Sequence, residues 1–432
     1  MRTLLTDGGT FLLQLVDVFL VLALFSCSTW TVWSSSCCNQ INLNEVRPHS
    51  VSITEFGAVG DGITLNTKAF QNAIFYLNSF ADKGGAKLFV PAGRWLTGSF
   101  DLISHLTLWL DNDAVILGST FNLLTLLSQG SIWWNNFWNK TLNYTRPHLV
   151  ELMNSTGVLI SNVTFLNSPF WTIHPVYCSH VTIQNVTIIA PLSSPNTDGI
   201  NPDSSDNVCI EDCYISTGDD LISIKSGWDG YGISFGRPST NINIRRLIGK
   251  TTSAGIAIGS EMSGGVSEVH AEDIYIFDSH SAIRIKTSPG RGGYVRNVYI
   301  SNMILANVDI AIRFTGLYGE HPDDTYDPDA LPVIERITIK DVIGVKVKHA
   351  GLIQGIKGDN FVNICLSNIT LNVSSKLPWN CSYIKGFSDL VSPEACEPLK
   401  ERIFPEHCSD CYYLPNHLKS LSNQNWGAWL LS

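Results

Sequence analysis

A short pattern of apolar and polar positions recurs through the middle of the chain. Each copy opens with apolar residues, continues with two polar residues of which the second is mostly Asn or Asp, and closes on further apolar residues. Strict alternation predicts short strands, and starts 23 to 39 residues apart fall in the range of repeat architectures. Eight copies begin at Val158, Val181, Val208, Ile242, Val269, Val298, Ile337 and Ile364.

The polar residue that breaks each copy indicates a corner. Asn and Asp tolerate the left-handed backbone conformation, and they stand at Asn162, Asn185, Asp212, Asp273, Asn302, Asp341 and Asn368. Most copies continue into a second strand, such as LISIKS from Leu221. The units are too short for propeller blades, which need about four strands in 40–45 residues. We therefore predict an all-β right-handed parallel β-helix, with a β-sandwich of accidental similarity as the alternative.

The clearest helical spacing lies before the repeats. In the segment Asn66 to Leu77 the apolar residues recur at the period of a helix and share one face. These residues are Ala69, Phe70, Ala73, Ile74 and Leu77. We predict a short N-terminal capping helix here, because the ends of a solenoid must be covered.

The N-terminus has a different composition. Fifteen mostly apolar residues, Phe11–Phe25, precede the small residues Ser26-Cys27-Ser28. This run is shorter than the ~20 residues of a membrane span. Residues 1–28 are thus predicted to be a signal peptide, with an uncleaved anchor as the alternative. We divide the rest into a linker at 29–50, a β-helix at 51–372 and a cysteine-containing extension at 373–432.

Both interpretations of the N-terminus predict a secreted, extracellular or membrane-anchored protein. Eight Asn-x-Ser/Thr sequons support this, at Asn139, Asn143, Asn154, Asn162, Asn185, Asn368, Asn372 and Asn380. Beyond the N-terminus there are eight cysteines, which we expect to form disulfides: Cys178, Cys209, Cys213, Cys365, Cys381, Cys396, Cys408 and Cys411. The pair Cys408-x-x-Cys411 alone also fits a zinc or redox site, but no second such pair lies nearby.

The net charge of the chain limits the classes of molecule that it can bind. The chain has 28 Lys and Arg residues against 38 Asp and Glu residues, a net charge of −10. An acidic chain does not resemble a general binder of phosphate backbones, so nucleic acid is excluded as a partner. An acidic polysaccharide would be bound only through a local basic patch.

Five charged residues at similar offsets in successive coils form the candidate site. Parallel coils stack about 4.8 Å apart, so Asp198, Asp219 and Asp220 should meet Arg284 and Lys286 on one edge. Neighbouring carboxylates repel one another, which raises the pKa of at least one and separates acid from base, as glycoside hydrolysis requires. Taken singly, the two acidic segments are also ordinary turn sequences. The two bases suit capture of an anionic sugar.

These segments resemble a known family. NTDG (Asn196–Gly199), GDD (Gly218–Asp220) and RIK (Arg284–Lys286) are similar to the motifs of plant polygalacturonases, glycoside hydrolase family 28. The similarity extends to FGAVGDG (Phe56–Gly62), VPAGRWLTG (Val90–Gly98), PFWTIHP (Pro169–Pro175) and IGSEMSGG (Ile258–Gly265).

The resemblance implies a monomeric, cofactor-free and metal-free enzyme that hydrolyses α-1,4-galacturonan in pectin with inversion. It implies Asp219 as general acid, with Asp198 and Asp220 activating the water. Arg284 and Lys286, together with Asn196, would bind the substrate.

Two departures from the family pattern qualify this expectation. The usual Gly-His-Gly is replaced by Ser253-Ala254-Gly255, so the family histidine is absent at Ala254; Ser260 and Glu261 are candidates to compensate. The stretch 119–128 is also much shorter than in the family, as if about one coil were missing.

Three other functions remain open for the same residues. A catalytically silent β-helix that binds pectin would fit the missing histidine. A calcium-dependent pectate lyase shares the fold, but the NTDG, GDD and RIK set favours hydrolysis. Another acidic pectin, such as rhamnogalacturonan, could be the substrate, since fold does not fix substrate.

Overall fold

The computed structural model describes residues 47–119 and 129–401. The predicted signal peptide or anchor, most of the linker, residues 120–128 of the shortened stretch and residues 402–432 lie outside the described residues. Those predictions therefore stay predictions. Within the described ranges, no helix is both long enough and apolar enough to cross a membrane.

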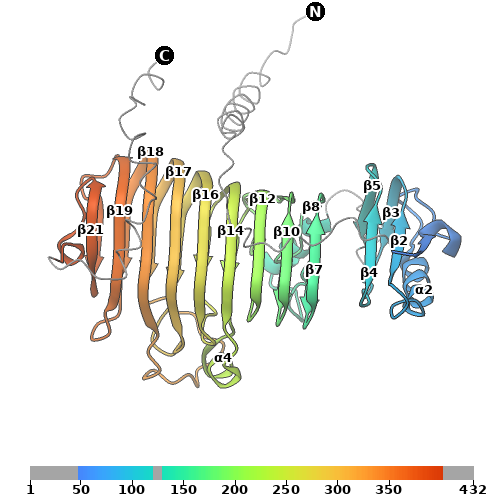
Figure 1. Ribbon diagram of the computed structural model, residues 1–432, viewed down its shortest axis with the longest axis horizontal. Coiled ribbons are helices and arrows are strands. Elements are labelled where there is room, and N and C mark those ends of the chain that lie inside the picture. The colour runs from blue at the N-terminus through green and yellow to red at the C-terminus, as the bar shows by residue number, and fades with distance from the viewer. Residues whose placement is uncertain (1–46, 120–128, 402–432) are drawn as a thin grey trace, which may run out of the picture. The chain divides into compact units, whose positions relative to one another are not determined.

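Residues 129–401 are dominated by one parallel sheet (Figure 1). Its central path runs β21-β19-β18-β17-β16-β14-β12-β10-β7. The first strands are β6 (Val150–Met153), β7 (Thr156–Ser161), β8 (Thr164–Leu166), β9 (Ile173–Val176), β10 (Ser179–Gln184), β11 (Thr187–Ile189), β12 (Asp206–Thr217) and β13 (Ile222–Ile224). They continue as β14 (Ser239–Thr251), β15 (Ala254–Ile258), β16 (Val266–Lys286), β17 (Tyr294–Thr315), β18 (Val333–Gln354), β19 (Phe361–Val373), β20 (Trp379–Ser382) and β21 (Ile384–Ser392). Helices are few: α3 (Gln129–Trp138), α4 (Asp229–Phe235) and η2 (Glu397–Leu399).

The sequence repeat sets the register of this sheet. All eight repeat starts are paired with one another in consecutive strands, from Val158 with Val181 through to Ile337 with Ile364. Each copy is thus one coil of a right-handed parallel β-helix, and the predicted fold class is confirmed.

The corners have the predicted conformation. All seven Asn and Asp residues named above have φ between 49° and 60°. Their side chains also stack: the Asn185 amide donates to Asn162 Oδ1 at 2.7 Å and the Asn368 amide to Asp341 Oδ1 at 2.7 Å. Two of these asparagines are therefore sequon residues whose amides stabilise the corner.

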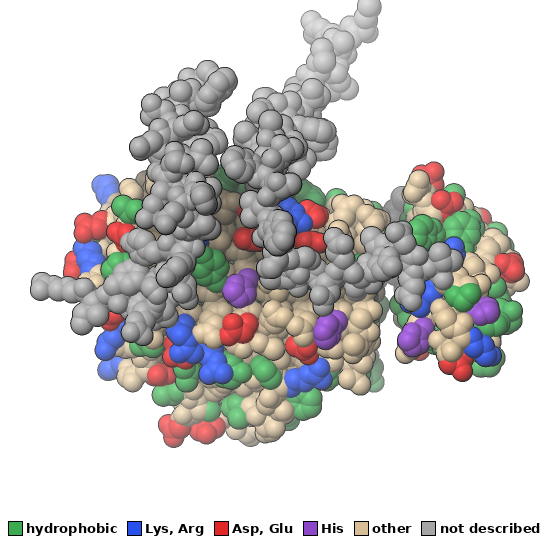
Figure 2. Space-filling model, in the orientation of Figure 1, with side chains coloured by type: hydrophobic (Ala, Val, Ile, Leu, Met, Phe, Trp, Pro, Cys, Tyr) green, Lys and Arg blue, Asp and Glu red, His purple; other side chains and the backbone are tan. Residues whose placement is uncertain are grey.

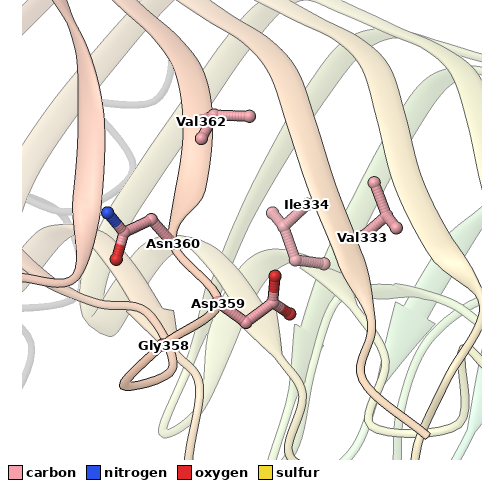
Figure 3. A pocket seen from close by; sticks show the side chains of 6 residues that line it. All are labelled: Val333, Ile334, Gly358, Asp359, Asn360 and Val362. Atoms are coloured by element: carbon pink, nitrogen blue, oxygen red, sulfur yellow. The ribbon is translucent and has the colours of Figure 1, made fainter.

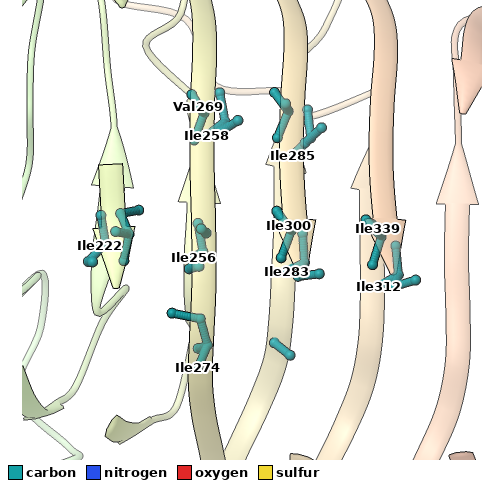
Figure 4. Close-up of a cluster of buried hydrophobic side chains, with 14 of the residues drawn as sticks. Ile222, Ile256, Ile258, Val269, Ile274, Ile283, Ile285, Ile300, Ile312 and Ile339 are labelled. Carbon is teal, nitrogen blue, oxygen red and sulfur yellow. The ribbon is translucent and has the colours of Figure 1, made fainter. Parts of the chain in front are cut away.

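The core is a stack of aliphatic side chains, one layer per coil. Ile222, Ile256, Ile283 and Ile312 are register partners in consecutive coils, and each is almost fully buried (Figure 4). Ile300 and Ile339 form part of a second such stack. Burying an isoleucine contributes about 1.5–3 kcal/mol relative to exposure, so these repeated layers rigidly position the side chains on the outer edge.

Residues 47–119 contain the predicted amphipathic helix. It is α2 (Thr67–Asn78), and the five residues predicted to share its apolar face are the ones it buries. They share a core with Leu88 and Trp95 of two small parallel sheets. These sheets are β1-β2-β4 and β3-β5, formed by β1 (His49–Ser52), β2 (Ala86–Val90), β3 (Gly93–Thr97), β4 (Leu106–Leu110) and β5 (Ala114–Gly118); η1 is Ile53–Phe56.

The parallel sheet continues past residue 372. Strand β20 pairs with β18 and β21 pairs with β19. One more coil therefore lies within the segment that the sequence alone assigned to an extension. The sequence pattern misses it because Gly386, not a β-branched residue, is the partner of Ile364.

The cysteines of the described residues are either disulfide-bonded or free thiols. Cys381 and Cys396 form a disulfide, and Cys209 and Cys365 are also disulfide-bonded. The expectation of a disulfide is wrong for Cys178 and Cys213, which are buried free thiols. Burial raises the pKa of Cys213 to about 12, so its thiol stays protonated and packs as a small apolar group. Cys408 and Cys411 lie outside the described residues.

Candidate active site

A cleft of about 650 Å³ is lined by the predicted site residues other than Asp220, which is fully buried. Carboxylates, cations and aromatic rings line it together: Phe137, Tyr144, Arg146, Phe170, Trp171, Asn196, Asp198, Asp219, Lys225, Ser253, Glu261, Arg284, Lys286, Tyr318 and Glu320. On the face drawn in Figure 2 acidic and basic side chains are interspersed. The cleft therefore supplies the local basic groups that an acidic protein needs to bind an anion.

A second pocket, of about 450 Å³, lies beside β18 and β19 (Figure 3). Its charged group is Asp359, accompanied by Asn360 and the apolar Val333, Ile334 and Val362. A lone carboxylate without a facing base offers no acid–base pair, so the cleft is the candidate active site.

Three carboxylates meet in the cleft. Asp198, Asp219 and Asp220 each present an oxygen within 4.8 Å of the others. Asp198 and Asp220 are buried, at 3% and 0% exposure, whereas Asp219 is partly exposed. Asp219 is therefore the carboxyl that a bound substrate can touch most directly.

Asp220 is held in its ionised form by its partners. Lys286 Nζ donates to Asp220 Oδ2 at 2.6 Å. The other oxygen accepts from Ser253 Oγ at 2.6 Å and from the Ala254 amide at 3.1 Å. At the sequence position of the missing family histidine, the Ala254 amide thus contacts the carboxylate, as does the hydroxyl of the neighbouring Ser253.

These surroundings separate the pKa values of the three acids. Burial and the Asp219 carboxylate raise the pKa of Asp198 well above its usual range. Burial and the Asp220 carboxylate raise the pKa of Asp219. Burial opposes ionisation of Asp220 as well, but the charge and hydrogen bond of Lys286 hold its pKa below the usual value. The cluster therefore pairs protonated and ionised carboxyls, as general acid–base chemistry requires.

The two predicted bases differ in their partners. Lys286 forms an ion pair with Asp220. Arg284 donates from Nη1 to Ser253 Oγ at 3.5 Å, while its Nε is buried without a hydrogen-bond partner among the described residues. A buried donor without a partner is costly, so Arg284 is the cation with capacity left for an anionic ligand.

Arg146 is a site residue that the sequence analysis missed. It is buried at 3% exposure, and its guanidinium lies 4.1 Å from the ring centroid of Phe137 and 4.7 Å from that of Phe170. Its Nη2 donates to Asn196 Oδ1 at 2.6 Å, and the Asn196 amide donates to Asp219 Oδ2 at 3.5 Å. Asn196 thereby connects Arg146 to the most exposed acid.

Comparison with known proteins also indicates a glycoside hydrolase. The family model for glycosyl hydrolases family 28 matches residues 113–396. A probable polygalacturonase of Vitis vinifera is 46% identical over 411 residues, covering 85% of this chain and 84% of its own length. A probable polygalacturonase of Arabidopsis thaliana is 31% identical over 336 residues, with 70% and 69% covered. The chain belongs to glycosyl hydrolase family 28.

Solved structures agree with this family membership. A hyperthermoactive exopolygalacturonase from Thermotoga maritima superimposes with a TM-score of 0.69 at 27% identity, covering 80% of this chain and 92% of its own. A polygalacturonase from Erwinia carotovora gives a TM-score of 0.62 at 22% identity, with 80% and 97% covered, and supports the fold. The predicted glycoside hydrolase is confirmed at the level of the family.

A second buried ion pair in this family 28 enzyme also escaped the sequence analysis. Lys225 Nζ lies 2.7 Å from Glu261 Oε2 and 4.4 Å from the centroid of the Trp171 ring. Glu261 therefore does not contact Asp220, and the Ser260 carbonyl accepts from Arg291. That these two residues compensate for the family histidine stays a prediction; the side-chain hydroxyl that contacts Asp220 is that of Ser253.

The aromatic wall of the cleft is supported from behind by histidine. His148 stacks on Phe170 and Trp171, with ring centroids 5.4 and 5.1 Å away. Burial and the neighbouring His174 lower the pKa of His148 to about 4, so its ring is neutral at physiological pH. Phe170, Trp171 and His174 lie in the PFWTIHP segment, but its pattern does not show that His148 stacks on the two aromatic rings, because that contact forms only in the folded chain.

Proposed function

We propose that this enzyme hydrolyses α-1,4-galacturonosidic bonds in pectic galacturonan. The observation that carries the proposal is Arg284, a cation with a buried, unpartnered Nε beside a cluster of three carboxylates in a cleft. A uronic acid presents a carboxylate to such a cation and a glycosidic oxygen to the acids. The polygalacturonase names of the relatives agree with this substrate class.

Asp219 acts as the general acid in this proposal. It is the least buried member of the cluster, and its raised pKa keeps a proton for the leaving oxygen. Asp198 also lines the cleft and positions the attacking water, and the ionised Asp220 behind it accepts the proton of that water. Arg284 binds a galacturonate carboxylate, Asn196 orients Asp219, and Lys286 keeps Asp220 ionised.

We infer inversion at the anomeric carbon. Most inverting glycosidases place their carboxyls ~6.5–9.5 Å apart, whereas retaining ones place them ~5–5.5 Å apart. Oxygens within 4.8 Å would by themselves favour retention. However, both oxygens of Asp220 are already hydrogen-bonded and its side chain is buried, so it is a poor nucleophile. Water is then the attacking group, and NMR of the first product anomer tests this.

We further infer that the enzyme acts outside the cytoplasm, as a secreted monomer in the cell wall. The sequons and the disulfide between Cys381 and Cys396 support an oxidising compartment. Membrane contact would arise only through an uncleaved N-terminal segment. Fractionation of the tagged full chain, followed by N-terminal sequencing, tests both points.

The deciding experiment measures reducing-end release from polygalacturonic acid without calcium. We expect release by the wild type and a loss of about 10²–10⁴-fold in Asp219→Asn, the range for removal of a general acid. The control Asp82→Asn changes an exposed turn acid and should keep full activity. A folded wild type that retains the polymer without producing new ends would instead be a pectin-binding protein. Ultraviolet-absorbing products that appear only when calcium is added would indicate a lyase.

A further inference from the structure

Two histidines and a glutamate converge behind the aromatic wall, outside the carboxylate cluster. Glu151 on β6 and His174 on β9 are register partners in adjacent coils, and His148 precedes β6. Glu151 Oε1 lies 3.3 Å from His148 Nδ1 and 3.5 Å from His174 Nδ1. The two Nδ1 atoms are 3.3 Å apart. Three metal-binding atoms therefore form a nearly equilateral triangle.

The size of this triangle matches one face of a coordination tetrahedron. Zinc binds imidazole nitrogen at about 2.0–2.1 Å and carboxylate oxygen at about 2.0–2.2 Å, which places tetrahedral ligand atoms about 3.3–3.5 Å apart. Octahedral ligands at the same bond lengths would lie only about 3 Å apart. We propose that His148, Glu151 and His174 bind a zinc ion, with water as the fourth ligand.

A second carboxylate supports the donor set. His174 Nε2 lies 3.4 Å from Asp203 Oδ2, on the side of the ring opposite Nδ1. With the ring proton on Nε2, directed at Asp203, the Nδ1 lone pair would be left for the metal, the carboxylate–histidine–metal arrangement of known zinc sites. The stacking of His148 on Phe170 and Trp171 fixes the other ring.

Access and ligand chemistry also fit zinc. The Glu151 side chain is 46% exposed, whereas those of His148 and His174 are 16% and 7% exposed. An ion can therefore enter past the glutamate into a site fixed by two buried rings. Two imidazoles and one carboxylate favour zinc over calcium or magnesium, which prefer oxygen ligands alone.

The site would act as a structural clamp for the cleft wall. It would join the segment that carries Arg146 to β9, and Arg146 reaches Asn196 and so Asp219. Zinc bound to the folded chain stabilises it by mass action, without taking part in bond cleavage.

Two experiments on the full-length chain, treated with chelator and dialysed, test the proposal. Zinc is titrated into the protein in a calorimeter, and melting curves are recorded with zinc, calcium or magnesium chloride. We expect one zinc per chain and a higher Tm with zinc alone. Glu151→Gln and His148→Gln should lower the affinity at least 10-fold, and Asp203→Asn about 10–100-fold.

Asp309→Asn is the matched control, because Asp309 also lies 3.3 Å from a histidine Nδ1, that of His280, but belongs to no such triangle among the described residues. It should bind zinc as the wild type does. Melting of each metal-free variant checks its fold. The proposal is overturned if the folded wild type binds no zinc, or if Glu151→Gln and His148→Gln bind it as tightly as Asp309→Asn.

Discussion

Two buried lysines at the cleft have almost the same geometry and different surroundings. Lys286 lies 2.6 Å from Asp220, and Lys225 lies 2.7 Å from Glu261. Asp220 is crowded by two further carboxyls, whereas Glu261 is paired with Lys225 beside Trp171. An ion pair in direct contact with a cluster of like charges decides which member ionises. The second pair chiefly holds its own two residues in place, although the charge of Lys225 also lowers the pKa of Asp198.

Breaking the first pair should have the largest effect. Lys286→Met leaves the Asp220 carboxylate buried without a counter-ion, which costs about 3–5 kcal/mol of unfolding free energy. The pKa of Asp220 then rises, so we also expect activity on polygalacturonic acid to fall by about 100-fold or more. Chemical denaturation and reducing-end assays measure the two effects.

The double variant Lys286→Met with Asp220→Asn is the control for that prediction. It removes both charges, so stability should return toward the wild type while activity stays low. A single Lys286→Met variant that melts like the wild type would show that the pair does not hold the Asp220 charge.

Breaking the second pair should have a smaller effect. In Lys225→Met the Glu261 carboxylate retains some contact with solvent, at 20% side-chain exposure, so we expect a loss of about 3 kcal/mol or less. The pH optimum should rise slightly, because the charge of Lys225 lowers the pKa of Asp198 and its loss lets that pKa rise. Urea melts and a pH–rate profile check this, with Glu261→Gln added to restore stability. A pH optimum that fell, or one that moved as far as in Lys286→Met, would contradict the contrast between the two pairs.

The sequence places the carboxylates of the first site together, but it does not predict the pair of Lys225 and Glu261, and the reason is physical. The repeat fixes the register, so residues at like offsets, such as Asp198 and Asp219, can be placed together from their spacing alone. Lys225 and Glu261 are 36 residues apart, and although both lie in segments that the sequence analysis names, their offsets do not show that the two side chains meet. Arg146 lies outside every repeat and meets Asn196 across 50 residues. The local spacing of residues in the sequence does not show which long side chains meet across neighbouring coils.

A third variant tests the surroundings of the first ion pair, Lys286 with Asp220, without removing either charge. Ser253→Ala removes the hydroxyl that donates to Asp220 Oδ1 at 2.6 Å but leaves Lys286 and the Ala254 amide in place. A hydrogen bond to a charged group contributes about 1.5–3 kcal/mol, so kcat should fall by about 10-fold to 100-fold. Ser253→Thr keeps the hydroxyl and should retain most activity. Equal kcat values in Ser253→Ala and the wild type would assign no role to this contact at the position of the missing histidine.

The smallest expected effect is on stability and depends on pH. The pKa of Asp219 is raised in the folded chain by burial and by Asp220, so the folded state binds this proton more tightly than the unfolded state does. At a pH below both pKa values the carboxyl is protonated in either state and costs nothing. As the pH rises past the unfolded pKa, the unfolded chain releases this proton first, so the stability of the folded state falls.

Asp219→Asn removes that cost, although it removes the general acid. The variant should melt like the wild type near pH 3 and at a higher temperature near pH 7, with a gain of about 1 kcal/mol, typical of relieving a destabilised active site. Calorimetric melts across this range measure it, and Asp82→Asn, at an exposed turn, should show no such trend. If the gain in Tm were instead largest at low pH, the charge of Asp219 would be stabilising the fold, and the repulsion that distinguishes the Asp220 pair from the Glu261 pair would be absent.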